Sequence, residues 1–254
     1  VPSASTRWIG QDTGEGQDNR MNISDFVDVL DDGMPHFDFI MFDACFMMSV
    51  EVAYEVRNYT DYYIGSPTEN PGPGAPYDKV VPYMFKPGAA AQMAEAYFNH
   101  YKDNYKAGEG ISNANWTGGT SICAVRTDAL DDLADVTGQL LERADNESVS
   151  SFNTVFDYDK RDMEEGHVGY YDFSQMMEMR LDADAYVAWK NVFDASIVYW
   201  NTTDKNYSMF KRMFSMEGTN GITHYIPLSV DSKAAEAYRS MAWYKAAGLE
   251  NMGW

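Results

Sequence analysis

Short apolar runs alternate with helical patterns through the first part of the chain, and this alternation limits the folds that are open to it. Residues 37–42 form an apolar run with the length of a buried strand, and apolar residues recur at helical spacing from 46 to 57. The alternation continues with predicted strands at 61–66 and 120–126 and predicted helices at 24–33, 89–105 and 127–144. Elements in this order predict an α/β layer fold with a mainly parallel sheet flanked by helices.

The pattern changes near residue 146, where helical segments begin to dominate. Predicted helices cover 173–181, 183–193 and 232–245, and strand candidates lie at 196–202 and 222–227. We therefore expect two parts. Residues 1–145 form the α/β region, and residues 146–254 form a helix-rich C-terminal region packed on it.

The net charge narrows the range of partners. The chain carries 39 acidic and 19 basic residues, which gives a formal net charge of −20. A field of that sign repels phosphate backbones, so we expect no nucleic-acid partner, and it attracts peptides that carry Lys or Arg. An acidic surface that serves solubility alone explains the charge equally well. The longest apolar neighbourhood, residues 37–54, is interrupted by charged side chains, so we expect no membrane span.

Cys45 is the first candidate for chemistry, because it follows the predicted strand at 37–42 and precedes the predicted helix at 46–57. A helix N-terminus lowers the pKa of a thiol and offers N–H groups to an oxyanion, as a nucleophile that attacks a carbonyl requires. The alternative is an inert buried thiol, which is the role that we expect for Cys123.

Asp43 lies two residues before Cys45 and faces the same side if the alternation of the strand persists. A carboxylate at the end of an apolar strand is costly to bury without a partner. It serves either as a cap on the following helix or as the receptor for a cationic group of a substrate beside the nucleophile.

The residues around this cysteine carry a resemblance to a known family. Residues 37–57, with the Asp-Ala-Cys block at 43–45, resemble the nucleophile motif of the clostripain family of cysteine peptidases. Residues 62–69 resemble the segment that follows this motif. A weaker likeness at 170–173, 221–227 and 243–245 extends the resemblance over most of the chain.

The resemblance implies a caspase-like α/β fold, shared with the legumains and gingipains, and an endopeptidase that cleaves after Arg or Lys with a Cys–His dyad. It implies that Cys45 is the nucleophile and that Asp43 helps to recognise the basic side chain. It also implies a set of residues on the wall of the first specificity pocket: Ser66, Thr68, Glu69 and Asp78.

The family also implies a biological setting. Several members are secreted bacterial precursors that process themselves into a light and a heavy chain, with the cut between the histidine and the cysteine. We therefore expect this chain to be a heavy chain of a secreted, cell-surface or periplasmic bacterial enzyme that acts on peptides and proteins. No cofactor is expected to be required, although some relatives depend on calcium.

The histidines do not follow the family pattern. The family's histidine lies in a His-Gly turn upstream of the cysteine, and no His-Gly pair occurs in this sequence. Among the four histidines, His36 is expected about 20 Å from Cys45 at the other end of the strand. His100 and His224 fall within regular elements, and His167 lies in a glycine-flanked loop that could swing toward the site. We therefore expect the histidine to come from a light chain or N-terminal segment outside this sequence.

Other functions remain open. A catalytically inactive module of the same fold that binds basic peptides also explains the missing histidine. A carbohydrate-binding module would use the 18 Tyr and 6 Trp, but such numbers are more typical of a core. No His or Cys pair has metal-ligand spacing, so we expect no metal site. The acidic pairs Asp157/Asp159 and Asp182/Asp184 lack the Gly and distal Glu of a calcium-binding EF-hand loop and are expected to be solvated.

Overall fold

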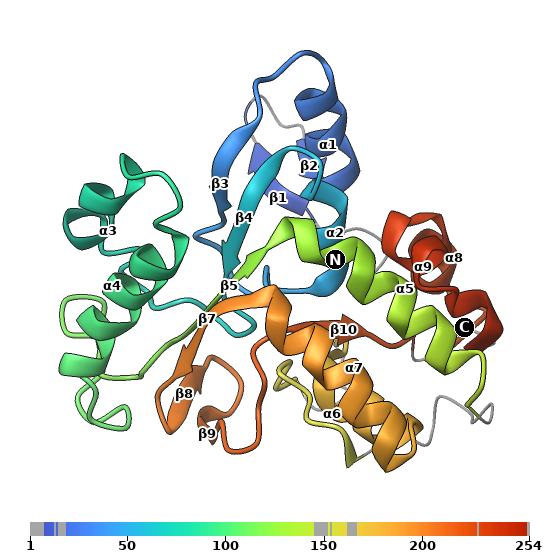
Figure 1. Ribbon diagram of the computed structural model, residues 1–254. Coiled ribbons are helices and arrows are strands. Elements are labelled where there is room, and N and C mark those ends of the chain that lie inside the picture. The colour runs from blue at the N-terminus through green and yellow to red at the C-terminus, as the bar shows by residue number, and fades with distance from the viewer. Residues whose placement is uncertain are drawn as a thin grey trace.

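The computed structural model describes residues 8–12, 14, 19–144, 152, 154–161, 167–227 and 229–252. A four-stranded sheet lies at its centre in the order β3-β4-β5-β7, and helices cover both of its faces (Figure 1). The strands are β3 (Phe37–Met41), β4 (Thr60–Gly65), β5 (Ser121–Arg126) and β7 (Ile197–Thr202). The layered α/β class expected from the sequence is confirmed.

The directions of the strands differ from the mainly parallel sheet that we predicted. β3 runs parallel to β4, whereas β5 is antiparallel to both β4 and β7, so one of the three pairings in the described sheet is parallel. An apolar run shows that a segment is a buried strand but carries no information on its direction. Between β4 and β5 the chain passes through two helices and returns to the same end of the sheet, where Gly65 pairs with Cys123.

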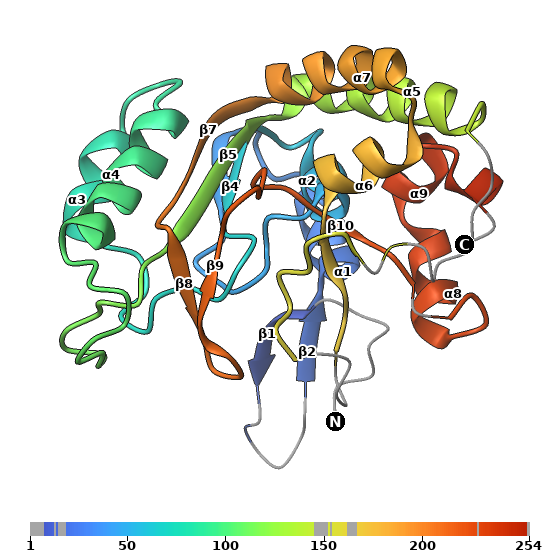
Figure 2. The ribbon, with the colours of Figure 1, turned by 90° about the horizontal axis from the view of Figure 1, so that it is seen from below.

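The core consists of two apolar layers, one on each face of the sheet. Figure 2 shows the helices that cover them. Because side chains alternate along a strand, Tyr63 faces one layer and Ile64 faces the other. The helices α3 (Tyr77–Met84) and α4 (Ala90–Asp103) cover the Ile64 face. Cys123 is fully buried on the Tyr63 face, as expected, and burial raises the pKa of its thiol.

Several helices form the layer on the Tyr63 face of the sheet. They are α1 (Ile23–Asp31), α2 (Val50–Val56), α5 (Leu130–Leu141), α6 (Phe173–Arg180), α7 (Ala183–Ser196), α8 (Lys233–Ser240) and α9 (Ala242–Ala246). The predicted helix at 232–245 is two helices, because Met241 between them has an extended backbone with φ −67° and ψ 147°. No helix in the described ranges is long and apolar enough to cross a bilayer.

The remaining elements are short. They are β1 (Trp8–Asp12), β2 (Asn19–Asn22), β6 (Tyr170–Asp172), β8 (Lys205–Ser208), β9 (Arg212–Ser215), β10 (Thr223–Tyr225) and the 3₁₀ turns Thr127–Ala129 and Leu249–Met252. β8 and β9 form a hairpin, and β6 pairs with β10. The proposed division of the chain falls at residue 145, which lies outside the described residues; β7, from the second part, is a strand of the central sheet.

Candidate active site

Cys45 lies in a sharp turn that follows β3. The chain after β3 is bonded to the chain that continues from β4: the N–H of Phe46 donates to the Thr68 carbonyl at 2.9 Å, and that of Met48 to the Ser66 carbonyl at 3.0 Å. Helix α2 begins at Val50, and its N-cap is Ser49, whose Oγ accepts from the Val52 N–H. The expectation that Cys45 stands at the N-terminus of a helix is therefore wrong, and the helix supplies it with no capping N–H.

The residue after the cysteine adopts a conformation that is rare for its type. Phe46 has φ +59°, in the left-handed region that bulky side chains seldom occupy. Its ring stacks on Tyr170 of β6, with the ring centres 4.9 Å apart and the planes 3° from parallel. Such outliers persist where their surroundings hold them, and they cluster at active sites. The turn leaves Cys45 exposed on the surface of the protein.

The N–H of Asn70 donates a hydrogen bond to the thiol of Cys45 at 3.2 Å. Desolvation of the sulfur raises the pKa of the Cys45 thiol, the Asn70 N–H opposes this rise, and the negative charges of Glu69 and Asp43 add to it. A raised pKa leaves little thiolate near neutral pH. The thiol in this environment therefore needs a cationic or basic partner before it can act as a nucleophile.

Asp43 anchors the loop that covers this end of the sheet. Its Oδ2 accepts a hydrogen bond from the Ala75 N–H at 2.8 Å and one from the Tyr77 hydroxyl at 3.3 Å, and its Oδ1 accepts from Asn70 Nδ2 at 3.0 Å. The alternative of a helix cap is wrong for Asp43, because Ser49 caps α2. Asp43 nevertheless remains exposed, so its charge is accessible from solvent.

Ser66 and Thr68 lie below this surface. Both side chains are buried, and their hydroxyls lie 3.1 Å and 2.7 Å from Ser121 Oγ on β5. Asn206 also donates to the Thr68 hydroxyl at 3.3 Å. These hydroxyls therefore brace the strand ends beneath the site, and a role of either side chain in a specificity pocket stays a prediction.

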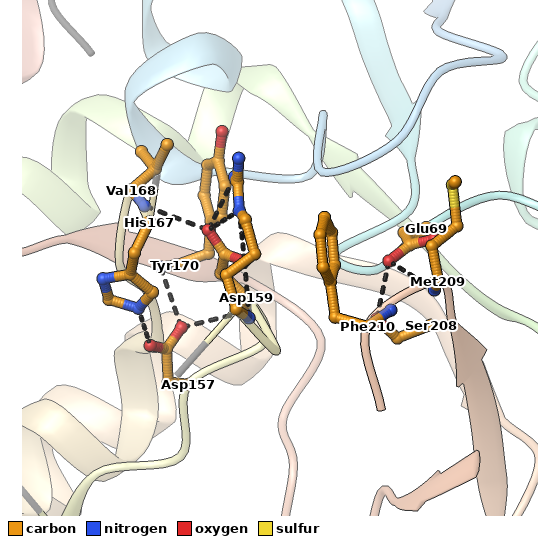
Figure 3. Close-up of polar contacts among 10 residues, drawn as sticks. Glu69, Asp157, Asp159, His167, Val168, Tyr170, Ser208, Met209 and Phe210 are labelled. Carbon is orange, nitrogen blue, oxygen red and sulfur yellow. Dashed lines mark hydrogen bonds and ion pairs between the residues drawn. The ribbon is translucent and has the colours of Figure 1, made fainter. Parts of the chain in front are cut away.

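Glu69 connects the loop that follows β4 to the β8–β9 hairpin (Figure 3). Its carboxylate accepts from the Ser208 hydroxyl at 2.7 Å and from the Met209 N–H at 3.1 Å. Phe210, at the same turn, is half exposed. Asp78, the fourth predicted wall residue, lies exposed in the first turn of α3 and pairs with Lys79 at 3.0 Å.

None of the four histidines bonds to Cys45, and all four lie in described segments. His36 pairs with Asp61 at 2.8 Å before β3, and His100 lies near the end of α4. His224 is buried, and its Nε2 accepts from Trp243 Nε1 at 3.0 Å. His167 is buried against Asp157, with Nε2 2.5 Å from the carboxylate (Figure 3).

The expectation that the acidic pair Asp157/Asp159 is solvated is wrong for Asp159. Asp159 is 2% exposed and accepts hydrogen bonds from the Arg161 side chain. It also accepts from the Val168 N–H (Figure 3). Asp182 and Asp184 are both exposed, as expected, and Asp182 also caps α7 by accepting from the Ala185 N–H at 2.9 Å. Within the described ranges, no group of three or more His, Cys, Asp or Glu side chains is arranged to hold a metal ion.

Asn70 is the site residue that the sequence did not indicate. It joins the two predicted residues, because its main-chain N–H reaches Cys45 and its side chain reaches Asp43. The run of Pro and Gly at 71–74 predicted an irregular loop here, but no pattern in the sequence distinguishes the one loop residue that makes both contacts.

Comparisons with known proteins identify the family of the chain. The family model described as Peptidase_C11, the clostripain family, matches residues 2–251. A search of curated proteins found no match. Among solved structures, a cysteine protease from B. fragilis is 39% identical with a TM-score of 0.85, and the match covers 97% of this chain and 99% of that one.

Two further structures extend the likeness. A secreted C11 cysteine protease from Bacteroides thetaiotaomicron, solved with an irreversible peptide inhibitor, is 41% identical with a TM-score of 0.86; the match covers 98% of this chain and 68% of that one. An inactive zymogen of a C11 protease from Parabacteroides distasonis is 26% identical with a TM-score of 0.75, over 89% of this chain and 62% of that one. The chain therefore belongs to the clostripain family of cysteine proteases, which have the caspase-like fold.

Proposed function

We propose that this chain supplies the nucleophile Cys45 and the recognition acid Asp43 of an endopeptidase that cleaves peptide bonds after arginine or lysine. The observation that carries the proposal is the meeting of both side chains at Asn70. A peptide that places its carbonyl at the sulfur has its adjoining side chain close to the carboxylate, so a basic side chain there gains a charge partner.

The charge around the site supports a basic substrate. Asp43 accepts hydrogen bonds from neutral donors, and no cation among the described residues forms an ion pair with it. The net charge of −20 gives the whole chain an acidic field that attracts cationic peptides. A Lys or Arg side chain at Asp43 would also offset one of the negative charges that raise the pKa of the Cys45 thiol.

We further propose that the catalytic histidine comes from a light chain or N-terminal segment outside this sequence. None of the four histidines forms a hydrogen bond with Cys45 in the described structure, and three of them are paired with other residues. The thiol, whose pKa is raised, needs a basic partner to lose its proton. The imidazole takes that proton, and the thiolate attacks the scissile carbonyl. The Cys45 N–H and that of the glycine after the histidine hold the oxyanion, and water then releases the acyl group from the sulfur.

The proposed setting rests on the family and on two relatives. The Bacteroides thetaiotaomicron relative is described as secreted, and a Parabacteroides distasonis relative as a zymogen, so we propose an exported bacterial enzyme that matures by cleavage. The covalent steps use a thiol and an imidazole, and we propose that they require no cofactor. Activity after EDTA treatment, with and without added calcium, tests whether calcium is needed.

The first test is intact mass of the natively purified protein under denaturing conditions, followed by assays with Arg, Lys and neutral peptide substrates. We expect a second polypeptide that contains a His-Gly pair, and turnover of the Arg and Lys substrates. A folded, purified chain without such a partner that still cleaves these substrates would contradict the proposed dyad.

The variant Asp43→Asn tests the recognition role. A charge pair at about 4 Å is worth about 4 kcal/mol at an effective dielectric constant of about 20. Because Asp43 is exposed, screening leaves about 1 kcal/mol, or roughly a fivefold preference. We expect kcat/KM to fall by about that factor more on Arg and Lys substrates than on neutral ones. Equal losses on all substrates would refute the role of Asp43 in the pocket.

The placement of the histidines also favours a second candidate, a catalytically inactive module that binds basic peptides. This candidate predicts no turnover in the intact assembly, together with binding of Lys- and Arg-containing peptides that survives alkylation of Cys45. Turnover that is abolished by the same alkylation would exclude it.

A further inference from the structure

Asn70 holds the recognition acid with its side chain and the nucleophile with its main chain. Its Nδ2 donates to Asp43 Oδ1 at 3.0 Å, and its N–H donates to Cys45 Sγ at 3.2 Å. The two groups therefore lie at the ends of one residue. A displacement of the Asp43 carboxylate is passed through the Asn70 side chain to the N–H that faces the sulfur.

The carbonyl oxygen of the Asn70 side chain indicates that this residue does more than fill space. Its Oδ1 is buried and has no hydrogen-bond partner among the described residues. A buried polar atom without a partner costs free energy, which an apolar side chain of similar size would avoid. The contact from Nδ2 to Asp43 is thus the gain that offsets this cost.

The far side of the Asp43 carboxylate is fixed independently of Asn70. Oδ2 accepts from the Ala75 N–H at 2.8 Å and from the Tyr77 hydroxyl. The Asp43 carboxylate is thus held in place by two donors. The hydrogen bond from the Asn70 side chain to this fixed carboxylate keeps residue 70 in position. Without the side chain, the main-chain N–H at residue 70 remains but is no longer tethered to the acid.

The sulfur is sensitive to the loss of this N–H because its other charged and titratable neighbours disfavour the thiolate. Desolvation raises the pKa of the Cys45 thiol, and the Asn70 N–H is the largest contribution in the opposite direction. Glu69, Asp43 and Tyr97 are the groups near the sulfur that carry or can acquire negative charge. Tyr77 and Tyr101 lie near Asp43.

We propose that Asn70 is a positioning residue that joins the recognition acid to the nucleophile, so that engagement of Asp43 by a basic side chain also sets the N–H that stabilises the Cys45 thiolate. This inference rests on the proposed function, because it takes Cys45 as the nucleophile and Asp43 as the recognition acid. It adds that basic substrates gain in kcat as well as in KM.

The test is a double-mutant cycle of Asp43→Asn and Asn70→Ala on the natively purified protein with any polypeptide that accompanies this chain. The readout is the pH midpoint of Cys45 alkylation by iodoacetamide, which is uncharged and needs no substrate recognition. In the Asn70→Ala background, Asp43→Asn removes a negative charge and lowers the midpoint. With Asn70 present, the same change also weakens the tether, because Asn70 Nδ2 loses its charged acceptor, so the midpoint falls less or rises.

Turnover gives the second readout. Asn70→Ala should lower kcat on Arg substrates about tenfold and change KM less than about threefold, since it disturbs the position of the main-chain N–H and leaves the cation contact at Asp43 in place. Asn70→Asp has the same shape but no N–H to give Asp43, so it should raise the alkylation midpoint further. Asn99→Ala, on the exposed face of α4, is the control and should change neither readout.

An additive cycle, in which Asp43→Asn shifts the midpoint equally in both backgrounds, would overturn the proposal. So would a loss in Asn70→Ala that falls on KM with kcat unchanged. Failure of the proposed function would give a different result, because Asp43→Asn would then leave the preference for Arg and Lys substrates intact. The alkylation cycle would still report whether the Asn70 side chain positions the N–H that faces the sulfur. Thermal unfolding of each variant shows that the comparison is made on folded protein.

Discussion

Replacement of Gly74 by Ala tests whether the position of the Asp43 carboxylate controls activity. Gly74 has φ +79°, and a Cβ added there would lie 3.0 Å from Asp43 Oδ2, 3.8 Å from its Cγ and 3.9 Å from its Oδ1. The new methyl group therefore presses on the carboxylate itself. The same substitution also forces an L-residue into the left-handed region.

The magnitude has two parts. An alanine in the left-handed conformation costs about 1–2 kcal/mol in stability. Ordinary contact begins at 3.4 Å, so the carboxylate must retreat by about 0.4 Å against the hydrogen bonds from the Ala75 N–H at 2.8 Å and Asn70 Nδ2 at 3.0 Å. Weakening one hydrogen bond to a charged acceptor is worth about 1.5 kcal/mol. We expect roughly a tenfold fall in kcat/KM on Arg substrates.

Gly33→Ala is the matched control. Gly33 has φ +85°, and a Cβ added there would meet no atom within 4 Å, so it carries the backbone cost without the contact. Denaturant unfolding should show a similar loss of about 1–2 kcal/mol from the backbone in both variants, and only Gly74→Ala should lose activity on Arg substrates. Equal kcat/KM for the two variants would refute the idea that the carboxylate position matters.

Three further predictions follow from the geometry. Phe46→Gly should be more stable than Phe46→Ala by about 1 kcal/mol in denaturant unfolding, because φ +59° is strained for Ala but not for Gly; the usual order, with Ala more stable, would contradict the strain. For His167, burial opposes the charge, but Asp157 outweighs it and raises the pKa above 6.5. The pair therefore stabilises the fold fully below pH 6.5, and this stabilisation is lost as pH rises through the raised pKa. In unfolding titrations, His167→Gln should lower the free energy of unfolding more at the acid end. A cost independent of pH would argue against the ion pair. Without the proposed histidine segment, alkylation of Cys45 should still increase above pH 9.0, since burial and then Glu69 raise the pKa of its thiol; a plateau below that pH would show activation from within the chain.

The sequence was most informative about buried strands. The apolar runs predicted at 37–42, 61–66 and 120–126 correspond to β3, β4 and β5 within one residue at each end, because burial on both faces of a sheet leaves a continuous apolar segment. Strand direction and the hairpin of β8 and β9 were not predictable in this way. Strand direction depends on where long connections return, which apolar patterns do not encode. The hairpin strands, Lys205–Ser208 and Arg212–Ser215, are short and carry no continuous apolar run.

Local conformation misled the prediction around Cys45. The spacing of apolar residues from 46 to 57 suits a helix, yet Phe46 is held in the left-handed region by its bond to Thr68 and its stacking on Tyr170. Because of these tertiary contacts, the helix begins at Val50 and not at Phe46. The two candidate residues Asp43 and Cys45 still lie together, because both follow a strand that the pattern identifies correctly.

The partners of the site residues could not be predicted. Glu69 reaches Ser208 and Met209, which lie 139 and 140 positions along the chain, and no local pattern reports such a contact. Asn70 acts through its main-chain N–H, a group that every residue except proline possesses. Asp159 was expected at the surface because it is charged, and its burial depends on Arg161 and Val168.

The central claim is that Cys45 is the nucleophile, and covalent labelling tests it most directly. The natively purified protein is treated with an irreversible peptide inhibitor that ends in arginine, and the adduct is located by peptide mass spectrometry. The account predicts one adduct on Cys45, none on the buried Cys123, and loss of both labelling and turnover in Cys45→Ala. An adduct on another residue, or turnover that persists in Cys45→Ala, would contradict it.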